Sequence, residues 1–348
     1  MNYRNIFITL AALSGTVTAS AWSAESATVA FLMPDQASTR YEQHDFPGFK
    51  AEMSKLCADC KVIYQNANAN ASLQQQQFNS VIAQGAKVIV LDPVDSSAAA
   101  ALVENAQAQG VKVIAYDRPV PDKPADFYVS FDNEGIGYAI AKSLTDHLKA
   151  SGVPQDAGVL QINGSPTDAA AGLIRDGIHR GLKESGYKTL AEFDTPEWAP
   201  PKAQEWTAGQ VTRFGDKIKG VVAANDGTGG GAIAAFKAAG VQPLPPVTGN
   251  DATIAALQLI IAGDQYNTIS KPSEIVAAAA AKVAVDFIQG KKPQASTTLY
   301  NTPSQLFTPE VVTAKNIKAE IFDKKIQTWD QVCSSEYAAA CQKLGISK

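Results

Sequence analysis

Short β-branched runs alternate with alanine-rich helical stretches along most of this chain. The runs are near-continuous in apolar residues rather than alternating, which is typical of strands covered on both faces of a parallel sheet. The stretches 73–83, 97–109 and 273–288 have the length expected of crossover helices between parallel strands. Serial βαβ units of this kind predict an α/β fold with two doubly wound parallel sheets. The expected strands are 29–33, 62–64, 88–91, 113–116, 127–131, 158–162, 220–224, 246–248 and 267–270.

The size and charge of the chain narrow the classes of protein to which it can belong. At about 150 residues per domain, its 348 residues indicate two domains, and 45% hydrophobic residues are enough for packed cores. The formal net charge is −4 and no basic cluster is present, so we expect no nucleic-acid partner. His44, His147 and His179 lie far apart in the sequence, so we expect no metal site.

The N-terminal segment has the pattern of a secretory signal peptide. Arg4 precedes an apolar run over residues 6–13, and small residues then lead to candidate cleavage sites after Ala21 or Ala24. The apolar run is shorter than the roughly 20 residues that a membrane-spanning helix needs. We therefore predict that residues 1–24 are a signal peptide and that the mature protein is exported.

Four cysteines in an exported chain favour two disulfide bonds, for which three pairings are possible. Cys57 and Cys60 are close enough for a local bond, and Cys333 and Cys341 are separated by a short loop near the C-terminus. A C-x-x-C redox site is the alternative, but in such a site the first cysteine opens a helix after a strand. Here a helical stretch precedes Cys57 and a strand follows Cys60. We therefore expect structural disulfide bonds.

Polar side chains follow most of the expected strands, at the edge where open α/β sheets bind ligands. Helix capping explains many of these residues, but Arg118 and Lys271 cannot accept hydrogen bonds from helix N–H groups. Together with Asp117 and Asp251, they suit a ligand with several hydroxyl groups, since each hydroxyl can donate to a carboxylate and accept from a cation. We interpret the following residues as helix caps: Asn68, Asn70, Ser72, Asp95 and Ser96.

The motifs of several enzyme classes are missing from the sequence. No Gly-x-Gly-x-x-Gly follows the first expected strand, and the glycine cluster at 227–231 lacks the Lys-Ser/Thr of a phosphate-binding loop. No Gly-x-Ser-x-Gly motif is present, and no histidine stands at a strand end as a general base. A pair of glycosidase carboxylates stays an open alternative. We expect that the protein is not an enzyme and has no catalytic residue and no cofactor.

Several of these segments resemble one protein family. Asp117-Arg118 after a strand is common to that family, whereas the run 126–134, Gly-Ser-Pro-Thr-Asp at 164–168 and Ser-Lys-Pro at 270–272 are much narrower features. On these residues the chain is similar to the type I periplasmic binding proteins of sugar ABC importers, and within them to the D-xylose-binding branch. The segments that carry the resemblance are 114–118, 126–134, 163–168, 221–226, 249–251, 269–272, 297–299 and 306–309.

The resemblance implies two discontinuous α/β lobes joined by a hinge of three crossover strands. The N-terminal lobe would comprise residues 25–131 with 272–305, and the C-terminal lobe residues 132–271 with 306–348. The crossovers would lie near 130–133, 270–273 and 304–308.

The resemblance also implies a monosaccharide site in the cleft between the lobes. A pyranose carries hydroxyls at its edge and C–H groups on its faces, so Tyr41 and Trp198 would cover a face while charged and amide groups bind the edge. Two alternatives stay open, namely Trp198 as a surface aromatic residue and Arg40 as a solvated loop charge. The predicted ligand-binding residues are Arg40, Tyr41, Asp117, Arg118, Asp168, Trp198, Asn225, Asp251 and Lys271.

Two positions depart from the D-xylose-binding pattern. Tyr41 stands where those proteins tend to have Trp, and Ala170 stands where they usually carry Asn, two residues beyond Asp168. The loss of that amide removes one hydroxyl partner and leaves space. A hexose or a differently oriented pentose therefore becomes a plausible ligand.

The resemblance implies a periplasmic, monomeric sugar-binding component of an ABC importer, which closes around its ligand and then meets a membrane permease. A chemoreceptor or sensor kinase is a possible further partner. The alternatives are a different aldose such as glucose or arabinose, and an exported sugar-processing enzyme. Transcriptional regulators of the same fold carry an N-terminal helix-turn-helix, where this chain has an export signal.

Overall fold

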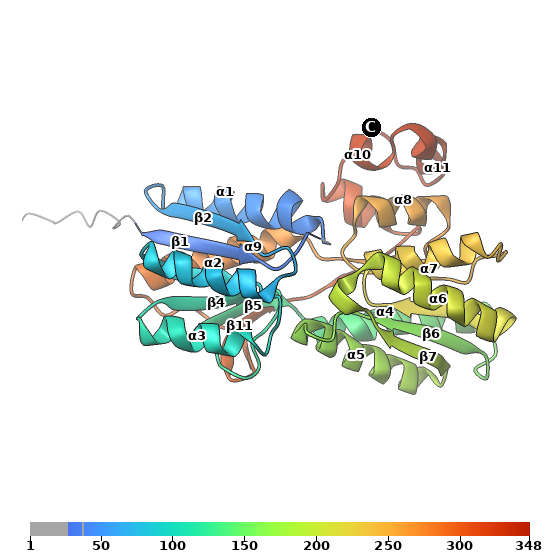
Figure 1. The fold of residues 1–348 in the computed structure, drawn as a ribbon. Coiled ribbons are helices and arrows are strands. Elements are labelled where there is room, and N and C mark those ends of the chain that lie inside the picture. Colours follow the sequence, from blue (N-terminus) through green and yellow to red (C-terminus); the bar gives the residue numbers. More distant parts are fainter. Residues whose placement is uncertain (1–26, 37) are drawn as a thin grey trace, which may run out of the picture.

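The computed structural model describes residues 27–36 and 38–348, and the signal peptide predicted over residues 1–24 lies outside them. Figure 1 shows two α/β bodies joined by several connecting segments. We call the elements around a seven-stranded sheet the first lobe (residues 28–131 and 273–307) and the others the second lobe (residues 133–270 and 310–343). Both contain parallel strands, so the predicted α/β fold with parallel sheets is confirmed.

The first lobe has the strand order β10-β11-β5-β4-β3-β1-β2, in which β10 and β11 form an antiparallel hairpin. Its strands are β1 (Thr28–Met33), β2 (Lys61–Asn66), β3 (Ala86–Leu91), β4 (Lys112–Tyr116), β5 (Phe127–Phe131), β10 (Thr297–Leu299) and β11 (Thr302–Phe307). Its helices are α1 (Phe46–Leu56), α2 (Ala71–Ala83), α3 (Ala99–Ala108) and α9 (Ser273–Ile288).

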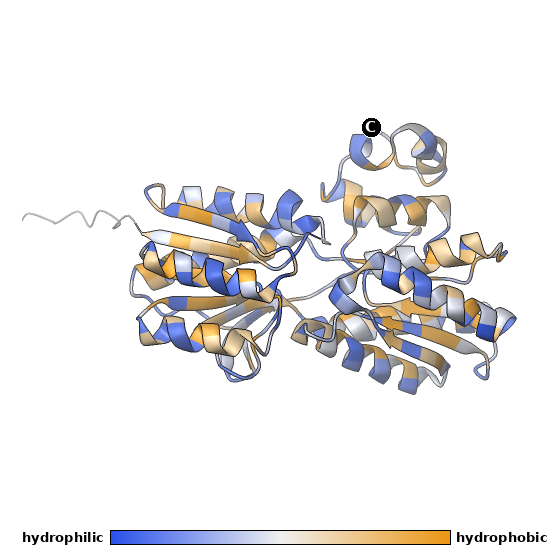
Figure 2. Cartoon of the chain, viewed as in Figure 1, coloured by the Kyte–Doolittle hydropathy of each residue, from blue (hydrophilic) through white to orange (hydrophobic). Residues whose placement is uncertain are grey.

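The strand β1 shows why the predicted strands are apolar along their whole length. Val29, Phe31 and Met33 belong to the core cluster that includes side chains of α1 and α9. Ala30 and Leu32 belong to the cluster on the other face, which includes side chains of α2 and α3. Both faces of the sheet are thus buried, and the strands are largely orange in Figure 2 while the helices show both colours.

The second lobe is built around a parallel β7-β6-β8 sheet and an antiparallel β12-β9 pair. Backbone hydrogen bonds join them through the segment at Val247, since Thr248 N donates to Val221 O (3.0 Å) and Tyr266 N to Val247 O (2.8 Å). The strands are β6 (Gly158–Asn163), β7 (Lys188–Asp194), β8 (Ile218–Ala223), β9 (Asn267–Ser270) and β12 (Glu310–Thr313). The helices are α4 (Asn133–Ala150), α5 (Ala169–Ser185), α6 (Pro200–Phe214), α7 (Asp226–Ala238), α8 (Ile254–Ala262), α10 (Trp329–Val332) and α11 (Ala338–Lys343).

The chain passes between the lobes at three places, from β5 to α4, from β9 to α9 and from β11 to β12. β11 pairs with β5 as far as Phe307 opposite Phe131, which is beyond the predicted boundary at residue 305. Elsewhere the exact bounds of the lobes stay a prediction. The carboxyl ends of β4 and β6, on different lobes, lead into the loops that face each other across the cleft.

Two disulfide bonds use all four cysteines, in one of the three possible pairings. Cys57 ends α1 and is bonded to Cys60 just before β2. Cys333 and Cys341 join the C-terminal helices in a core cluster that also contains side chains of α8. Within residues 27–36 and 38–348, no helix combines the length and apolar character needed to cross a membrane.

Candidate functional site

All nine residues predicted to bind a ligand line one cavity between the lobes. The cavity encloses about 360 Å³ of space, solvent at its mouth included. Five further residues line it, and none of them was among the predicted ligand-binding residues. These five are Ser38, Asn133, Ala170, Ile174 and Asn250.

Asp117 is held in a backbone conformation that is rare for a residue with a side chain. Its φ is +59°, in the left-handed region. Its carbonyl oxygen accepts hydrogen bonds from Tyr128 Oη (2.8 Å) and Ser130 Oγ (2.9 Å). Those two side chains from β5 stabilise the turn after β4. The Asp117 carboxylate is thereby aimed into the cavity, where it accepts a hydrogen bond from Arg40.

Arg40 is buried between two carboxylates. Its Nη1 donates to Asp45 Oδ1 (2.8 Å) and its Nη2 to Asp117 Oδ2. Only 8% of Arg40 is exposed, so the alternative of a solvated loop charge is wrong. Burial alone raises the pKa of Asp117, but the charges of Arg40 and Lys271 outweigh burial and hold that pKa below its usual value. The Asp117 carboxylate is therefore an ionised acceptor.

Arg118 is surrounded by carboxylates from both lobes. Its Nη2 donates to Asp35 Oδ2 (2.8 Å), and its Nε lies 3.4 Å from Asp92 Oδ1 and 3.2 Å from Asp168 Oδ2. Burial raises the pKa of Asp92 well above its usual value. Asp35 and Asp92 follow strands in the sequence, but no sequence signal assigned them to the site. Both carboxylates lie beside the guanidinium of Arg118, which lines the cavity.

Asp168 combines helix capping with a contact to Trp198. Its Oδ1 accepts from the backbone N–H groups of Ala170 (2.7 Å) and Ala171 (3.3 Å), at the start of α5. Its Oδ2 accepts from Trp198 Nε1 at 2.9 Å. Trp198 is only 8% exposed, so the alternative of a surface aromatic residue is wrong.

Gly164 allows the Trp198 indole to lie close to the strand end. A Cβ atom at Gly164 would come within 2.1 Å of the indole ring. Trp198 itself has φ +56°, in the turn that precedes α6. The ring is thus placed against the cavity by a close approach that a larger residue at position 164 would prevent.

Asn225 also caps a helix while it lines the cavity. Its Oδ1 accepts from Thr228 N (2.8 Å) in a capping box at the start of α7. Among the residues described, its side-chain NH₂ group has no hydrogen-bond partner, and Asn225 is 8% exposed. The amide therefore offers a donor to a ligand in the cavity.

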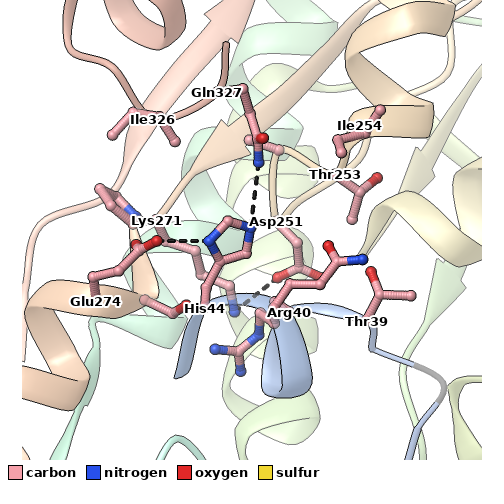
Figure 3. A pocket seen from close by; sticks show the side chains of 14 residues that line it. Thr39, Arg40, His44, Asp251, Thr253, Ile254, Lys271, Glu274, Ile326 and Gln327 are labelled. Carbon is pink, nitrogen blue, oxygen red and sulfur yellow. Dashed lines mark hydrogen bonds and ion pairs between the residues drawn. The ribbon is translucent and has the colours of Figure 1, made fainter. Parts of the chain in front are cut away.

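Asp251 and Lys271 form an ion pair at the hinge side of the cavity. Lys271 Nζ lies 3.0 Å from Asp251 Oδ1 and 4.0 Å from Asp117 Oδ1. Figure 3 shows this pair beside Arg40. In an adjoining pocket that Arg40, Asp251 and Lys271 also line, His44 Nδ1 lies 2.6 Å from Glu274 Oε1. This hydrogen bond is the main reason why the pKa of His44 is raised.

Cationic, carboxylate and amide side chains line the cavity together with the aromatic side chains of Tyr41 and Trp198. Such a set binds a neutral molecule with several hydroxyl groups, because each hydroxyl can both donate and accept. Among the residues that the structure describes, no group of three or more His, Cys, Asp or Glu side chains is arranged to hold a metal ion.

Comparisons with known proteins agree with this geometry. A family model described as a periplasmic binding protein domain matches residues 29–292. The chain is 37% identical over 326 residues to the D-xylose-binding periplasmic protein of Escherichia coli (strain K12), with 91% of this chain and 96% of that protein covered. It is 32% identical over 280 residues to the D-xylose-binding periplasmic protein of Haemophilus influenzae, with 78% and 82% covered.

Solved structures show the same fold. A carbohydrate transporter solute binding protein from Chloroflexus aurantiacus, in complex with D-glucose, matches with a TM-score of 0.79 at 26% identity, and 87% of this chain and 97% of that chain are covered. These three relatives are named as binding proteins, and this chain is likewise a binding protein and not an enzyme. Because the family model matches most of its length, the chain belongs to the periplasmic binding protein family.

Proposed function

We propose that the protein binds a monosaccharide, D-xylose before other aldoses, in the cavity between its lobes and delivers it to a membrane ABC permease. One observation carries this proposal. The nine residues chosen from the sequence come from both lobes and the hinge, yet they line a single cavity. A ligand held by both lobes stabilises their closed arrangement, because only there do all of its contacts form.

Each lobe would supply a different part of the recognition. From the first lobe, Asp117 accepts from sugar hydroxyls while Arg40 and Arg118 donate to them. From the second lobe, Trp198 covers one face of the ring and Asn225 donates its amide. Tyr41, Asp168, Asp251 and Lys271 complete the proposed set.

The choice of D-xylose rests on two relatives that bear this name, at 37% and 32% identity. Glucose or arabinose is the second candidate, because Ala170 lines the cavity where the D-xylose-binding pattern usually has Asn. Export to the periplasm through the signal peptide, a monomeric state and a chemoreceptor or sensor kinase as further partner belong to the same proposal.

Isothermal titration calorimetry with the mature protein tests the proposal directly. The panel should contain D-xylose, D-glucose, L-arabinose and D-ribose, and a thermal-shift series should run in parallel. A sugar that binds only the native state at a thousandfold excess over its Kd stabilises the protein by about 4 kcal/mol. A shift with D-glucose but not D-xylose would overturn the choice of sugar, and no shift with any aldose would overturn monosaccharide binding. Recovery of the sugar unchanged, checked by NMR, would exclude turnover.

A further inference from the structure

Two loops meet directly across the cleft, one from each lobe. Ser96 N donates to Thr167 O (3.0 Å), and Ala169 N donates to Ser96 Oγ (3.1 Å). A third bond runs from Thr167 Oγ1 to Val94 O (3.3 Å). The loop between β3 and α3 is thus bonded to the loop between β6 and α5 in the other lobe.

The sequence predicts a different role for Ser96, that of a cap on the following helix. No side chain caps α3, and Asp95 Oδ1 accepts from Ala98 N (2.8 Å) in the turn that precedes this helix. The Ser96 hydroxyl caps a helix of the opposite lobe, where Ala169 is the first residue of α5. Ser96 is only 3% exposed, so both of its bonds are shielded from water.

These contacts flank the proposed sugar site without being part of it. Thr167 and Ala169 stand on either side of Asp168, which lines the cavity, but neither they nor Ser96 or Val94 line it. The bonds between the loops therefore need no ligand atom, and they exist only when the lobes are together.

We infer that Ser96 is a positioning residue that stabilises the closed arrangement of the lobes and so raises the affinity for every bound sugar by the same factor. The inference rests on the proposed function. If the sugar-binding state is the closed one, the apparent Kd equals the intrinsic Kd divided by the fraction of molecules that are closed. A contact that stabilises the closed arrangement without touching the sugar changes the fraction of closed molecules and leaves the intrinsic Kd as it is.

Ser96→Ala removes the acceptor for Ala169 N while it keeps the backbone bond to Thr167. Because closure would then bury an N–H group without a partner, we expect the Kd to rise about five- to tenfold, by an equal factor for each sugar that binds. The dissociation rate should increase, and the urea unfolding midpoint of the ligand-free protein should stay that of the unaltered chain. Titrations with D-xylose, D-glucose and L-arabinose together with stopped-flow dissociation measure these quantities.

Ser97→Ala is the matched control, because Ser97 is the exposed neighbour of Ser96 and the same hydroxyl is removed. Its Kd should equal that of the unaltered protein. Thr167→Val removes the bond to Val94 and also the contact of Thr167 Oγ1 with Ser165 Oγ (3.1 Å) in its own loop. It should weaken binding in the same direction by less, which keeps the inference testable if Ser96→Ala does not fold. A Kd of the Ser96→Ala protein within twofold of the unaltered one, or a factor that differs between sugars, overturns the inference. If the unaltered protein binds no sugar, the proposed function itself fails, and the inference with it.

Discussion

Arg118 and Asp168 form an ion pair between the two lobes, with Arg118 Nε 3.2 Å from Asp168 Oδ2. Both residues are buried, at 3% and 5% exposure. Burial raises the pKa of Asp168, and the neighbouring Arg118 charge opposes that rise. Asp168 also caps α5 and accepts from Trp198, so one carboxylate links the helix, the aromatic wall and the opposite lobe. The proposed sugar site is thus directly coupled to the position of the lobes.

Asp117→Asn should weaken sugar binding more than any change at the cavity rim. The substitution removes an ionised acceptor beside Arg40 and leaves that buried guanidinium with one carboxylate fewer. A hydrogen bond to a charged group contributes about 1.5–3 kcal/mol, which predicts a rise in Kd of roughly tenfold or more. Calorimetry with D-xylose measures it. Asp122→Asn, an exposed carboxylate close by in the sequence, is the control, and an unchanged Kd of Asp117→Asn would contradict the assigned role.

Ala170→Asn should shift sugar preference toward D-xylose. Ala170 lines the cavity, so an amide at this position would supply one more partner for a hydroxyl of the sugar. We expect the ratio of the Kd for D-glucose to the Kd for D-xylose to rise about tenfold, as expected when a site gains a specific hydrogen bond. The ratio should be measured alongside the free energy of unfolding. A fall in affinity for both sugars by equal factors would show that the cavity has no room for the amide.

Asp226 should make the stability of the protein depend on pH. Its buried carboxylate accepts from Thr253 N (2.8 Å) and Thr268 Oγ1 (2.7 Å), and burial together with the charge of Asp251 raises its pKa from 3.8 to about 7. The native state therefore holds this proton more tightly than the unfolded state. Its contribution to stability is fully present below pH 3.8 and declines as the pH rises through about 7.

Asp226→Asn removes this ionisation, so the free energy of unfolding should fall less between pH 4 and about 7 than in the unaltered protein. Urea unfolding across that range measures the slope. Asp216→Asn changes an exposed carboxylate and should leave the slope as it was. If the free energy of unfolding depends on pH in the same way for Asp226→Asn and for the unaltered protein, the role assigned to the Asp226 carboxylate is wrong.

The disulfide between Cys333 and Cys341 should stabilise the fold without affecting sugar binding. It closes a loop with a sequence separation of 8 inside the core cluster that contains Ile321 and Val332. Chain-entropy estimates for a loop of this size give about 2–3 kcal/mol. Replacement of both cysteines by serine should lower the free energy of unfolding by this amount in urea. The Kd for sugar should stay within twofold, because neither cysteine lines the cavity, and a larger change would show that the C-terminal segment influences the site.

Most core strands could be predicted from the sequence, but β7, β10, β11 and β12 were not among the expected strands. β3 and β4 are apolar because helices cover both faces of their sheet, and this requirement is visible in their residues. β7 lies at the edge of its sheet and its residues are partly exposed, so Lys188–Asp194 has no continuous apolar run to predict it.

Many residues that line the candidate site could be selected from the sequence, because parallel strands bring their carboxyl ends to one edge of the sheet. Asp117 and Asp251 could be selected there by residue type and family resemblance. Asp45 could not, since nothing in the sequence distinguishes this buried partner of Arg40 from an ordinary helix residue. Asn133 was likewise missed, because it begins α4 on the far side of a crossover.

The sequence by itself determined the α/β fold, the cysteines available for bonding and the residue types that face the cleft. These depend on local periodicity and on where each strand ends. Only the tertiary structure decided that Ser96 bonds to Thr167 and Ala169 rather than to its own helix. A hydroxyl can cap its own helix or reach another, and the choice depends on how closely the lobes pack, which no local pattern encodes.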